Sequence, residues 1–267
     1  MDLGLKGKTV IVTGGSSNIN RANVLTFARE GANVVNADID DEMGPKVVAE
    51  ANAQGGGGKT IYVKTDVTSW ESVQAMTKKT VDEFGQIDVL VNGVGWVDTP
   101  WGLFMEQTRE TWEKMVALNF WSTINCTRAV LEHMIPRKYG KIINIGSEAG
   151  RIGEFRQVIY SATKGGVISF TKALAKEVGR YNINVNCLCP AGVIPEKAEH
   201  VSKLSMTQGV TQENMPEELK AKQVKMYPIG RVAVPQDVAN MAVYLASDAA
   251  SFVHGQTISV NGGYSTL

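Results

Sequence analysis

Short apolar runs rich in β-branched residues alternate along the chain with longer amphipathic stretches. Such runs predict strands that are covered on both faces. The stretches between them predict helices, at about residues 19–30, 41–54, 69–84, 108–136, 158–180 and 235–247. The predicted strands are Thr9–Thr13, Asn33–Asp38, Thr60–Thr65, Val89–Val94, Lys141–Ile145, Asn184–Leu188 and Thr257–Val260.

The regular alternation of strand and helix predicts an α/β fold. We expect residues 1–267 to form a single Rossmann-type domain, a doubly wound parallel sheet of about seven strands with helices on both faces. The one long irregular stretch, 193–228, follows the sixth predicted strand. Ligands bind at the carboxyl ends of strands in this architecture, so this stretch is predicted to be a substrate lid.

Composition and charge narrow the classes of partner. The chain has 27 Lys and Arg against 27 Asp and Glu, so nothing in its charge favours nucleic acid or an anionic membrane. No apolar run reaches the ~18 residues of a membrane span, and the first residues do not resemble a signal peptide. The three cysteines lack framework spacing, which favours a cytoplasmic location. Cys187 and Cys189 are expected to be buried thiols; a metal pair is the alternative.

A phosphate-binding loop is suggested by TGGSSNIN, which follows the first predicted strand. Gly14 permits the tight turn, and backbone N–H groups at the next helix N-terminus would face a pyrophosphate. Asp38 ends the second strand, where an acidic side chain binds ribose hydroxyls and disfavours a 2′-phosphate, so NAD is expected over NADP. Asp66 is predicted either to bind adenine or to cap the following helix.

The motifs taken together resemble the classical branch of the short-chain dehydrogenase/reductase family, over residues 5–264. The family pattern TGxxxGxG falls on Thr13 to Asn20, NNAG on Asn92 to Gly95, and YxxxK on Tyr160 and Lys164. The resemblance implies a catalytic tetrad of Asn119, Ser147, Tyr160 and Lys164. It also implies that NAD contacts Gly14, Ser17, Asn18, Ile19, Asp38, Asp66, Val67, Asn92 and Gly93.

The tetrad chemistry follows from elementary acidities. A free phenol has a pKa near 10 and is a poor base at neutral pH, but a nearby ammonium favours the phenolate. Tyr160 would therefore remove the hydroxyl proton of a secondary alcohol, with Lys164 lowering its pKa and Ser147 bonding the reacting oxygen. The resemblance gives Asn119 the role of holding a water near Lys164. An ordinary surface pair of Tyr160 and Lys164 is the alternative.

Candidate substrate-binding residues lie between Ser147 and Tyr160 and after the fourth predicted strand. Arg151 and Arg156 are predicted to contact an anionic substrate group, because guanidinium matches carboxylate, although solvated loop arginines remain the alternative. Trp96, with Trp101 further along, is expected either at an aromatic or acyl pocket or in simple lid or interface packing. Lysines in the lid would suit CoA phosphates, but interleaved glutamates favour a solvated helix face.

Several departures from the family pattern fall beside the expected cofactor. Asn18 and Asn20 stand where the phosphate loop has glycine, Val94 replaces Ala, and Ala191 follows Pro190 where the family has Gly. Asn tolerates left-handed backbone angles, but its side chain adds bulk near the pyrophosphate. We therefore favour weak or lost NAD binding, in a non-catalytic subunit paired with an active paralogue of the same family. The alternative is an active NAD-dependent dehydrogenase, assembled with itself, that uses Tyr160 as base.

The resemblance extends, within the family, to dehydrogenases of anaerobic aromatic degradation that act on hydroxyacyl-CoA thioesters. Subunits of 2-(hydroxybenzyl)succinyl-CoA dehydrogenases are the specific likeness. An acyl-CoA substrate, a tetrameric assembly and the absence of nucleic-acid or membrane partners are what this resemblance implies.

Overall fold

The computed structural model describes residues 2–98, 101–205 and 209–267. It shows one parallel sheet with the strand order β3-β2-β1-β4-β5-β6-β7, which confirms the predicted doubly wound architecture. The order reverses between β1 and β4, so a crevice opens at the carboxyl ends of these two strands. The strands are β1 Thr9–Thr13, β2 Asn33–Asp38, β3 Thr60–Lys64, β4 Val89–Asn92, β5 Gly140–Ile145, β6 Ile183–Pro190 and β7 Thr257–Val260.

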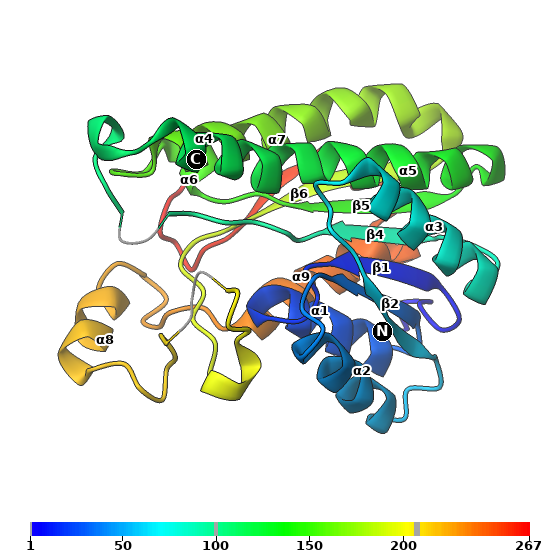
Figure 1. Cartoon of the computed structure of the whole chain (residues 1–267), viewed down its shortest axis with the longest axis horizontal. Coiled ribbons are helices and arrows are strands. Elements are labelled where there is room, and N and C mark those ends of the chain that lie inside the picture. The colour runs from blue at the N-terminus through cyan, green and yellow to red at the C-terminus, as the bar shows by residue number, and fades with distance from the viewer. Residues whose placement is uncertain (1, 99–100, 206–208) are drawn as a thin grey trace.

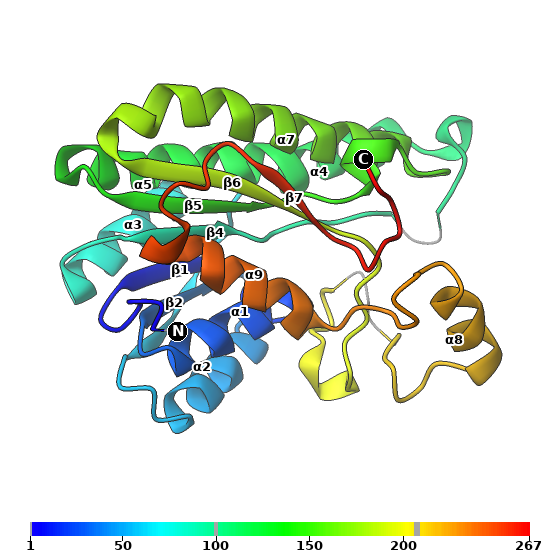
Figure 2. The same ribbon diagram turned by 180° about the vertical axis from the view of Figure 1, so that it is seen from behind.

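Helices cover both faces of the sheet, as Figures 1 and 2 show. Successive side chains of β1 point to opposite faces: Val10 and Val12 pack with Phe27, whereas Ile11 joins the core on the other face with Met134. No helix in the described ranges is long and apolar enough to cross a membrane. One face carries α1 (Asn18–Arg29), α2 (Met43–Ala53) and α9 (Pro235–Ala246), and the other carries α3 (Trp70–Phe84), α4 (Arg109–Val116), α5 (Ser122–Arg137) and α7 (Val158–Val178).

The long helix predicted at 108–136 is interrupted. A single π-helical turn, Ala117–Trp121, separates α4 from α5. Such turns place one extra residue in the helix and often occur at functional sites. Here the turn carries Asn119, whose side chain is thereby directed inward and fully buried.

The stretch at 193–228 was predicted to be irregular, and it is so only in part. It contains α8 (Glu217–Val224), which starts directly after Pro216, a residue that suits the start of a helix. In Figure 1 this segment lies beside the carboxyl ends of the strands and outside the two helix layers. Short helical segments also occur at α6 (Ala149–Ile152), Phe104–Glu106, Gly179–Tyr181, Ala198–His200 and Asp248–Ala250.

Candidate active site

One large cavity of about 780 Å³ lies at the carboxyl ends of the strands. This volume falls within the roughly 300–1,000 Å³ of small-molecule sites. Its wall includes Gly14 and Asp38 at one end, Ser147, Tyr160 and Lys164 in the middle, and Tyr227 from the stretch 193–228. The cavity therefore joins, without a break, the predicted cofactor residues and the predicted catalytic residues.

The phosphate loop keeps the backbone shape of a glycine loop. Gly14 has φ +67°, and a Cβ there would lie only 3.0 Å from a methyl of Val94. Asn18 has φ +48°, in the left-handed region where the family pattern places glycine. Asparagine adopts this region more readily than most residues, so the loop turns as expected without the second glycine. Both residues, with Ser17 and Ile19, line the cavity.

The side chain of Asn20 fills the space next to Gly93, which has no side chain of its own. The Asn20 amide Nδ2 donates to the Gly93 carbonyl at 2.8 Å, and a Cβ placed on Gly93 would overlap the Asn20 amide. The family pattern has glycine at the position of Asn20 and asparagine at the position of Gly93. In this chain the amide therefore comes from the start of α1 and not from the segment after β4. The Asn20 amide is thereby held toward β4, where Gly93 leaves room for it.

Asp38 ends β2 with its carboxylate facing the cavity. Its oxygens accept from the N–H of Ser16 at 2.9 Å and of Asp40 at 3.0 Å. The nearby cations are already paired: Lys64 with Asp41, and Lys46 and Lys203 with Glu42. A ligand at Asp38 therefore meets a carboxylate, and these three described lysines near it are already paired with acids.

Asp66, Val67 and Asn92 divide between cavity and framework. Asp66 and Val67 line the cavity, but Asp66 Oδ1 also accepts from the Thr68 N–H at 2.9 Å, ahead of α3. Ser69, not Asp66, is the N-cap of α3, so the predicted capping role is wrong and the contact with adenine stays a prediction. Asn92 lies outside the cavity wall and donates to Thr127 at 2.9 Å and Asn144 at 2.8 Å. Asn92 consequently ties β4 to its neighbours, while Gly93 beside it reaches the cavity.

Ser147, Tyr160 and Lys164 meet because β5 ends just before Ser147 and α7 begins beside it. Tyr160 and Lys164 lie four residues apart on α7, so they share one face. The buried Lys164 ammonium donates to the Ile145 carbonyl at 2.8 Å and lies 5.8 Å from the Tyr160 ring centre. A Cβ on Gly95 would come within 3.1 Å of this ammonium, so a glycine there leaves it room.

Asn119 does not line the cavity itself, but it holds Trp96, which does, next to the other three members of the predicted tetrad. Its Oδ1 accepts from the Trp96 N–H at 2.6 Å, and its Nδ2 donates to the Trp96 carbonyl at 2.8 Å. The side chain of Asn119 is thus occupied with the Trp96 backbone, and it sets where the Trp96 indole enters the cavity.

Burial dominates the acidities of the catalytic pair. Burial raises the pKa of Tyr160, which a hydrogen bond with Ser147 partly opposes. Burial also lowers the pKa of Lys164 to about 8. A pKa of Tyr160 lowered by Lys164 was expected from the sequence. The net direction is the reverse, because loss of hydration outweighs the hydrogen bond with Ser147.

The two predicted substrate arginines lie elsewhere. Arg151 donates to the Leu267 carbonyl at 2.8 Å and to Ser259, so it holds the C-terminal segment. Arg156 stacks on the exposed Phe155, with 5.4 Å from its guanidinium carbon to the ring centre. Neither lines the cavity, whereas Trp96 and Trp101 both do.

The cavity wall also includes Glu154, Tyr264 and Lys114, which were not expected from the sequence. Tyr264 donates its hydroxyl to Glu154 at 2.6 Å, across 110 residues of sequence. Lys114, on α4, places its ammonium 4.1 Å from the Trp96 ring centre. No motif or spacing marks these residues, because each acquires its role from a contact that only the fold creates.

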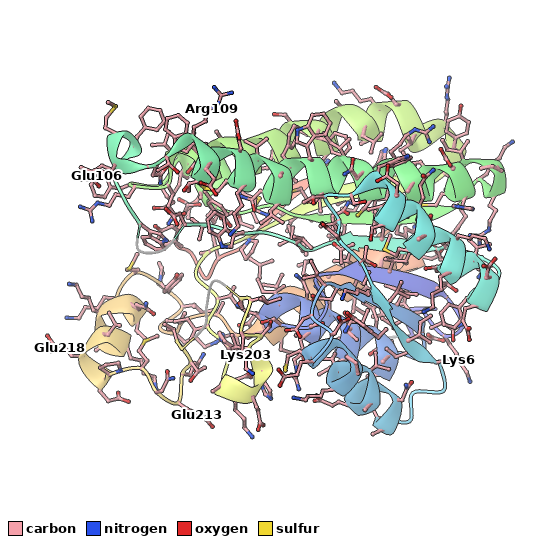
Figure 3. The ribbon with its side chains drawn as sticks, in the orientation of Figure 1. Lys6, Glu106, Arg109, Lys203, Glu213 and Glu218 are labelled. Atoms are coloured by element: carbon pink, nitrogen blue, oxygen red, sulfur yellow. The ribbon has the colours of Figure 1, made fainter. Side chains whose placement is uncertain are left out.

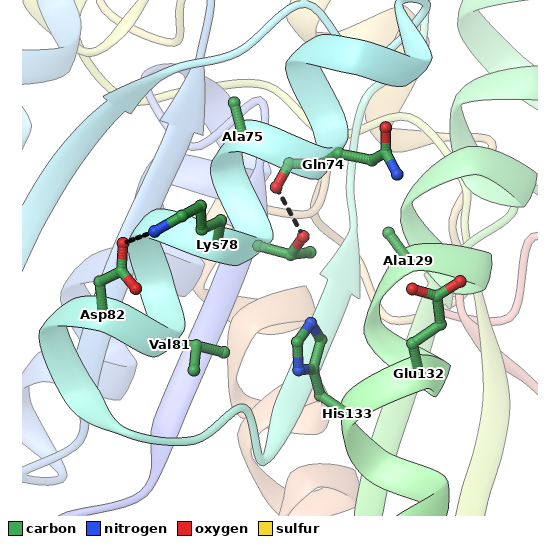
Figure 4. A pocket seen from close by; sticks show the side chains of 9 residues that line it. Gln74, Ala75, Lys78, Val81, Asp82, Ala129, Glu132 and His133 are labelled. Atoms are coloured by element: carbon green, nitrogen blue, oxygen red, sulfur yellow. Dashed lines mark hydrogen bonds and ion pairs between the residues drawn. The ribbon is translucent and has the colours of Figure 1, made fainter.

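Other parts of the described chain offer no comparable chemistry. No group of three or more metal-binding side chains occurs within it. Cys187 and Cys189 are fully buried, and the hydrogen bond that Cys187 donates to Cys189 together with burial raises the pKa of Cys187, so this thiol stays neutral. Figure 4 shows a shallower hollow between α3 and α5, where Lys78 pairs with Asp82 and His133 lies near Glu132.

Comparison with known proteins gives the family. The family model described as "Enoyl-(Acyl carrier protein) reductase" matches residues 14–265. A "3-oxoacyl-[acyl-carrier-protein] reductase FabG" of Chlamydia pneumoniae is 37% identical over 98% of this chain and 99% of its own length. The FabG of Thermotoga maritima is 35% identical over 97% and 98%. The "(2S)-[(R)-hydroxy(phenyl)methyl]succinyl-CoA dehydrogenase subunit BbsD" of Thauera aromatica is 35% identical over 98% of both. This chain belongs to the short-chain dehydrogenase/reductase family of oxidoreductases.

Proposed function

We propose that this chain is itself an active oxidoreductase, which uses a nicotinamide cofactor to interconvert 3-hydroxyacyl and 3-oxoacyl thioesters. The observation that supports this most is the continuous cavity from Asp38 to Tyr160. A dinucleotide bound with its adenosine at Asp38 would reach the tetrad through this cavity. The non-catalytic interpretation loses its main support, since Asn18 keeps the loop conformation and Asn20 is anchored on Gly93.

The residues present fit a dinucleotide. The adenosine ribose would be held by the Asp38 carboxylate, the adenine by Asp66 and Val67, and the pyrophosphate by the turn from Gly14 to Ile19. When bound, the cofactor supplies a hydride acceptor or donor. NAD is proposed over NADP, because a 2′-phosphate would face Asp38 with the nearby lysines already paired to acids.

The chain's own residues handle the proton and the oxygen. In the oxidative direction the substrate hydroxyl gives its proton to the Tyr160 phenolate while Ser147 donates a hydrogen bond to the same oxygen. In the reductive direction the neutral Tyr160 hydroxyl returns that proton to the developing alkoxide. Lys164 stabilises the phenolate form by its charge. Asn119 acts as a positioning residue, and its proposed place in a water relay follows from the family.

The thioester class rests on relatives whose printed names contain an acyl carrier protein or CoA. Among these, an aromatic acyl group is a narrower proposal. It is supported by Trp96 and Trp101 at the cavity and by the likeness to the dehydrogenase subunit of Thauera aromatica. A spectrophotometric screen of straight-chain against phenyl-substituted 3-oxoacyl thioesters would test it. Equal kcat/KM for both would argue against aromatic selectivity.

We propose that residues 193–228 act as a substrate lid within a single domain. The described part of this stretch contributes Leu204, Met226 and Tyr227 to the cavity. It is also fastened to the cofactor end, because the Ser202 N–H donates to Ser17 Oγ at 3.0 Å and its hydroxyl bonds Asp40. Closure over both ligands would exclude water from the hydride transfer.

A homo-oligomer in the cytoplasm is the proposed assembly and location, in place of an obligate pair with a paralogue. An active site built wholly from one chain needs no second kind of subunit. Light scattering on the chain expressed alone would test this. A folded, active homo-oligomer is expected, while activity only after adding a different subunit would favour the paired assembly.

The direct test of the proposed function is to follow NADH absorbance with the purified chain and a 3-oxoacyl thioester of N-acetylcysteamine or CoA. Oxidation of NADH that depends on the thioester is expected. A folded chain that binds NADH but turns over none of these thioesters would overturn the proposed substrate class.

A further inference from the structure

Cationic side chains are scarce in the cavity wall. Among the described residues that line it, only Lys114 and Lys164 carry a positive charge. Lys164 is buried against the Ile145 carbonyl and belongs to the tetrad. Lys114 lies at the substrate end, in the last turn of α4, and is exposed.

Lys114 is placed against an aromatic face. Its ammonium lies 4.1 Å from the Trp96 ring centre, a geometry in which the ring attracts the cation. Trp96 is itself held at both its N–H and its carbonyl by Asn119. The Trp96 ring therefore gives the Lys114 ammonium a defined position at the substrate end of the cavity.

The ammonium lacks an acidic partner within the described residues, where the Trp96 ring is its one contact. The other cation of α4, Arg109, pairs with Glu113 and does not line the cavity; Figure 3 shows it projecting outward from the helix layer. The acids of the cavity wall at this end are engaged: Glu154 by the Tyr264 hydroxyl, and Glu148 by two serine hydroxyls. Lys114 thus keeps its three N–H donors for a ligand.

We infer that Lys114, seated on Trp96, is a binding subsite for an anionic group of the substrate. The chemistry that fits is a carboxylate or a phosphate, since a charge-assisted hydrogen bond is the strong interaction open to an ammonium. The aromatic face would support the apolar part of the same ligand. This inference rests on the proposed function for the position of the substrate.

Two sources of the anion need to be distinguished. A carboxylate would belong to the acyl group, and a phosphate to the CoA or carrier arm. Three 3-oxoacyl thioesters of equal chain length separate them: a methyl-ended N-acetylcysteamine thioester without charge, its carboxylate-ended counterpart, and the methyl-ended CoA thioester. kcat and KM would be measured for each with the native chain, Lys114→Met and Lys114→Arg.

Lys114→Met should raise KM for the anionic thioester by about tenfold or more, the range of a hydrogen bond to a charged group. The neutral thioester should change by less than about twofold, and Lys114→Arg should recover most of the loss. Loss confined to the carboxylate-ended thioester identifies an acyl carboxylate, and loss confined to the CoA thioester identifies a phosphate. Lys79→Met, on α3 away from the cavity, is the control of equal charge change.

Equal effects of Lys114→Met on all three thioesters, or no effect on any, would overturn the subsite. If the native chain turned over none of them, the proposed function would fail separately. Calorimetric binding of the carboxylate-ended and CoA thioesters would then still test the subsite. An unchanged Kd on Lys114→Met would reject it, and a raised Kd would support it without any turnover.

Discussion

The cofactor end and the substrate end of the cavity differ in how their polar side chains are held. At the cofactor end the Asp38 carboxylate is held by two backbone N–H groups, and the Asn20 amide compensates for the missing side chain of Gly93. At the substrate end, Lys114 has an aromatic seat and no acidic partner among the described residues. A motif residue that differs from its family pattern is therefore poor evidence of lost function until its neighbour in space is known. A lone cation at a cavity wall is better evidence of a ligand.

The largest effect is expected at the chemical centre between the two ends. Tyr160→Phe removes the proton donor and acceptor but little volume, so kcat should fall by roughly a hundredfold to ten-thousandfold, the range for general acid–base catalysis. NAD affinity should stay nearly unchanged, which calorimetry would show. Tyr244→Phe, on α9, is the matched control. Retained turnover in Tyr160→Phe would remove the tetrad from the mechanism.

The contact between Asn20 and Gly93 leads to a second prediction, at the cofactor end. Gly93→Asn alone forces a side chain onto the Asn20 amide and should cost about 1–3 kcal/mol of unfolding free energy, as overpacking does, and weaken NAD binding. Asn20→Gly together with Gly93→Asn should recover most of both losses. Thermal or denaturant unfolding and NAD titration on the native chain, the single variants Gly93→Asn and Asn20→Gly, and the double variant form a double-mutant cycle. Additive effects would show that the two residues do not share the space.

Asp38 tests whether the cofactor end selects NAD. Asp38→Asn keeps the shape and removes the charge that would repel a 2′-phosphate, so the ratio of NAD to NADP affinity should fall about tenfold. The ratio of Kd values is the measurement. An unchanged ratio would place the selectivity outside Asp38, for instance in the acids of the following turn.

The pH dependence follows from the raised pKa of Tyr160. Oxidation needs the phenolate, so its kcat/KM should rise with pH through neutrality, by up to tenfold per unit, until the tyrosine is ionised. Reduction needs the neutral phenol and should be nearly level there. A level oxidative profile from pH 6 to 9 would show that a different group removes the proton.

Motif spacing predicted many of the residues of this site, whereas the others depend on contacts between distant parts of the chain. The order of strands and helices placed Ser147, Tyr160 and Lys164 together, because local periodicity determines which residues share a helix face. The exchange between Asn20 and Gly93 could not be predicted, since it joins residues 73 positions apart. Arg151 was assigned to a substrate because its partner, the C-terminal segment, is 116 positions away. From the sequence alone, Lys114 is an ordinary solvent-facing residue of a predicted helix.

The most direct measurement is a calorimetric titration of NAD into the purified native chain at neutral pH. The structure predicts one site per chain with a Kd in the micromolar to sub-millimolar range, because the loop keeps its turn and Asp38 faces the cavity. No detectable binding by a folded chain would contradict the account and restore the interpretation of a non-catalytic subunit.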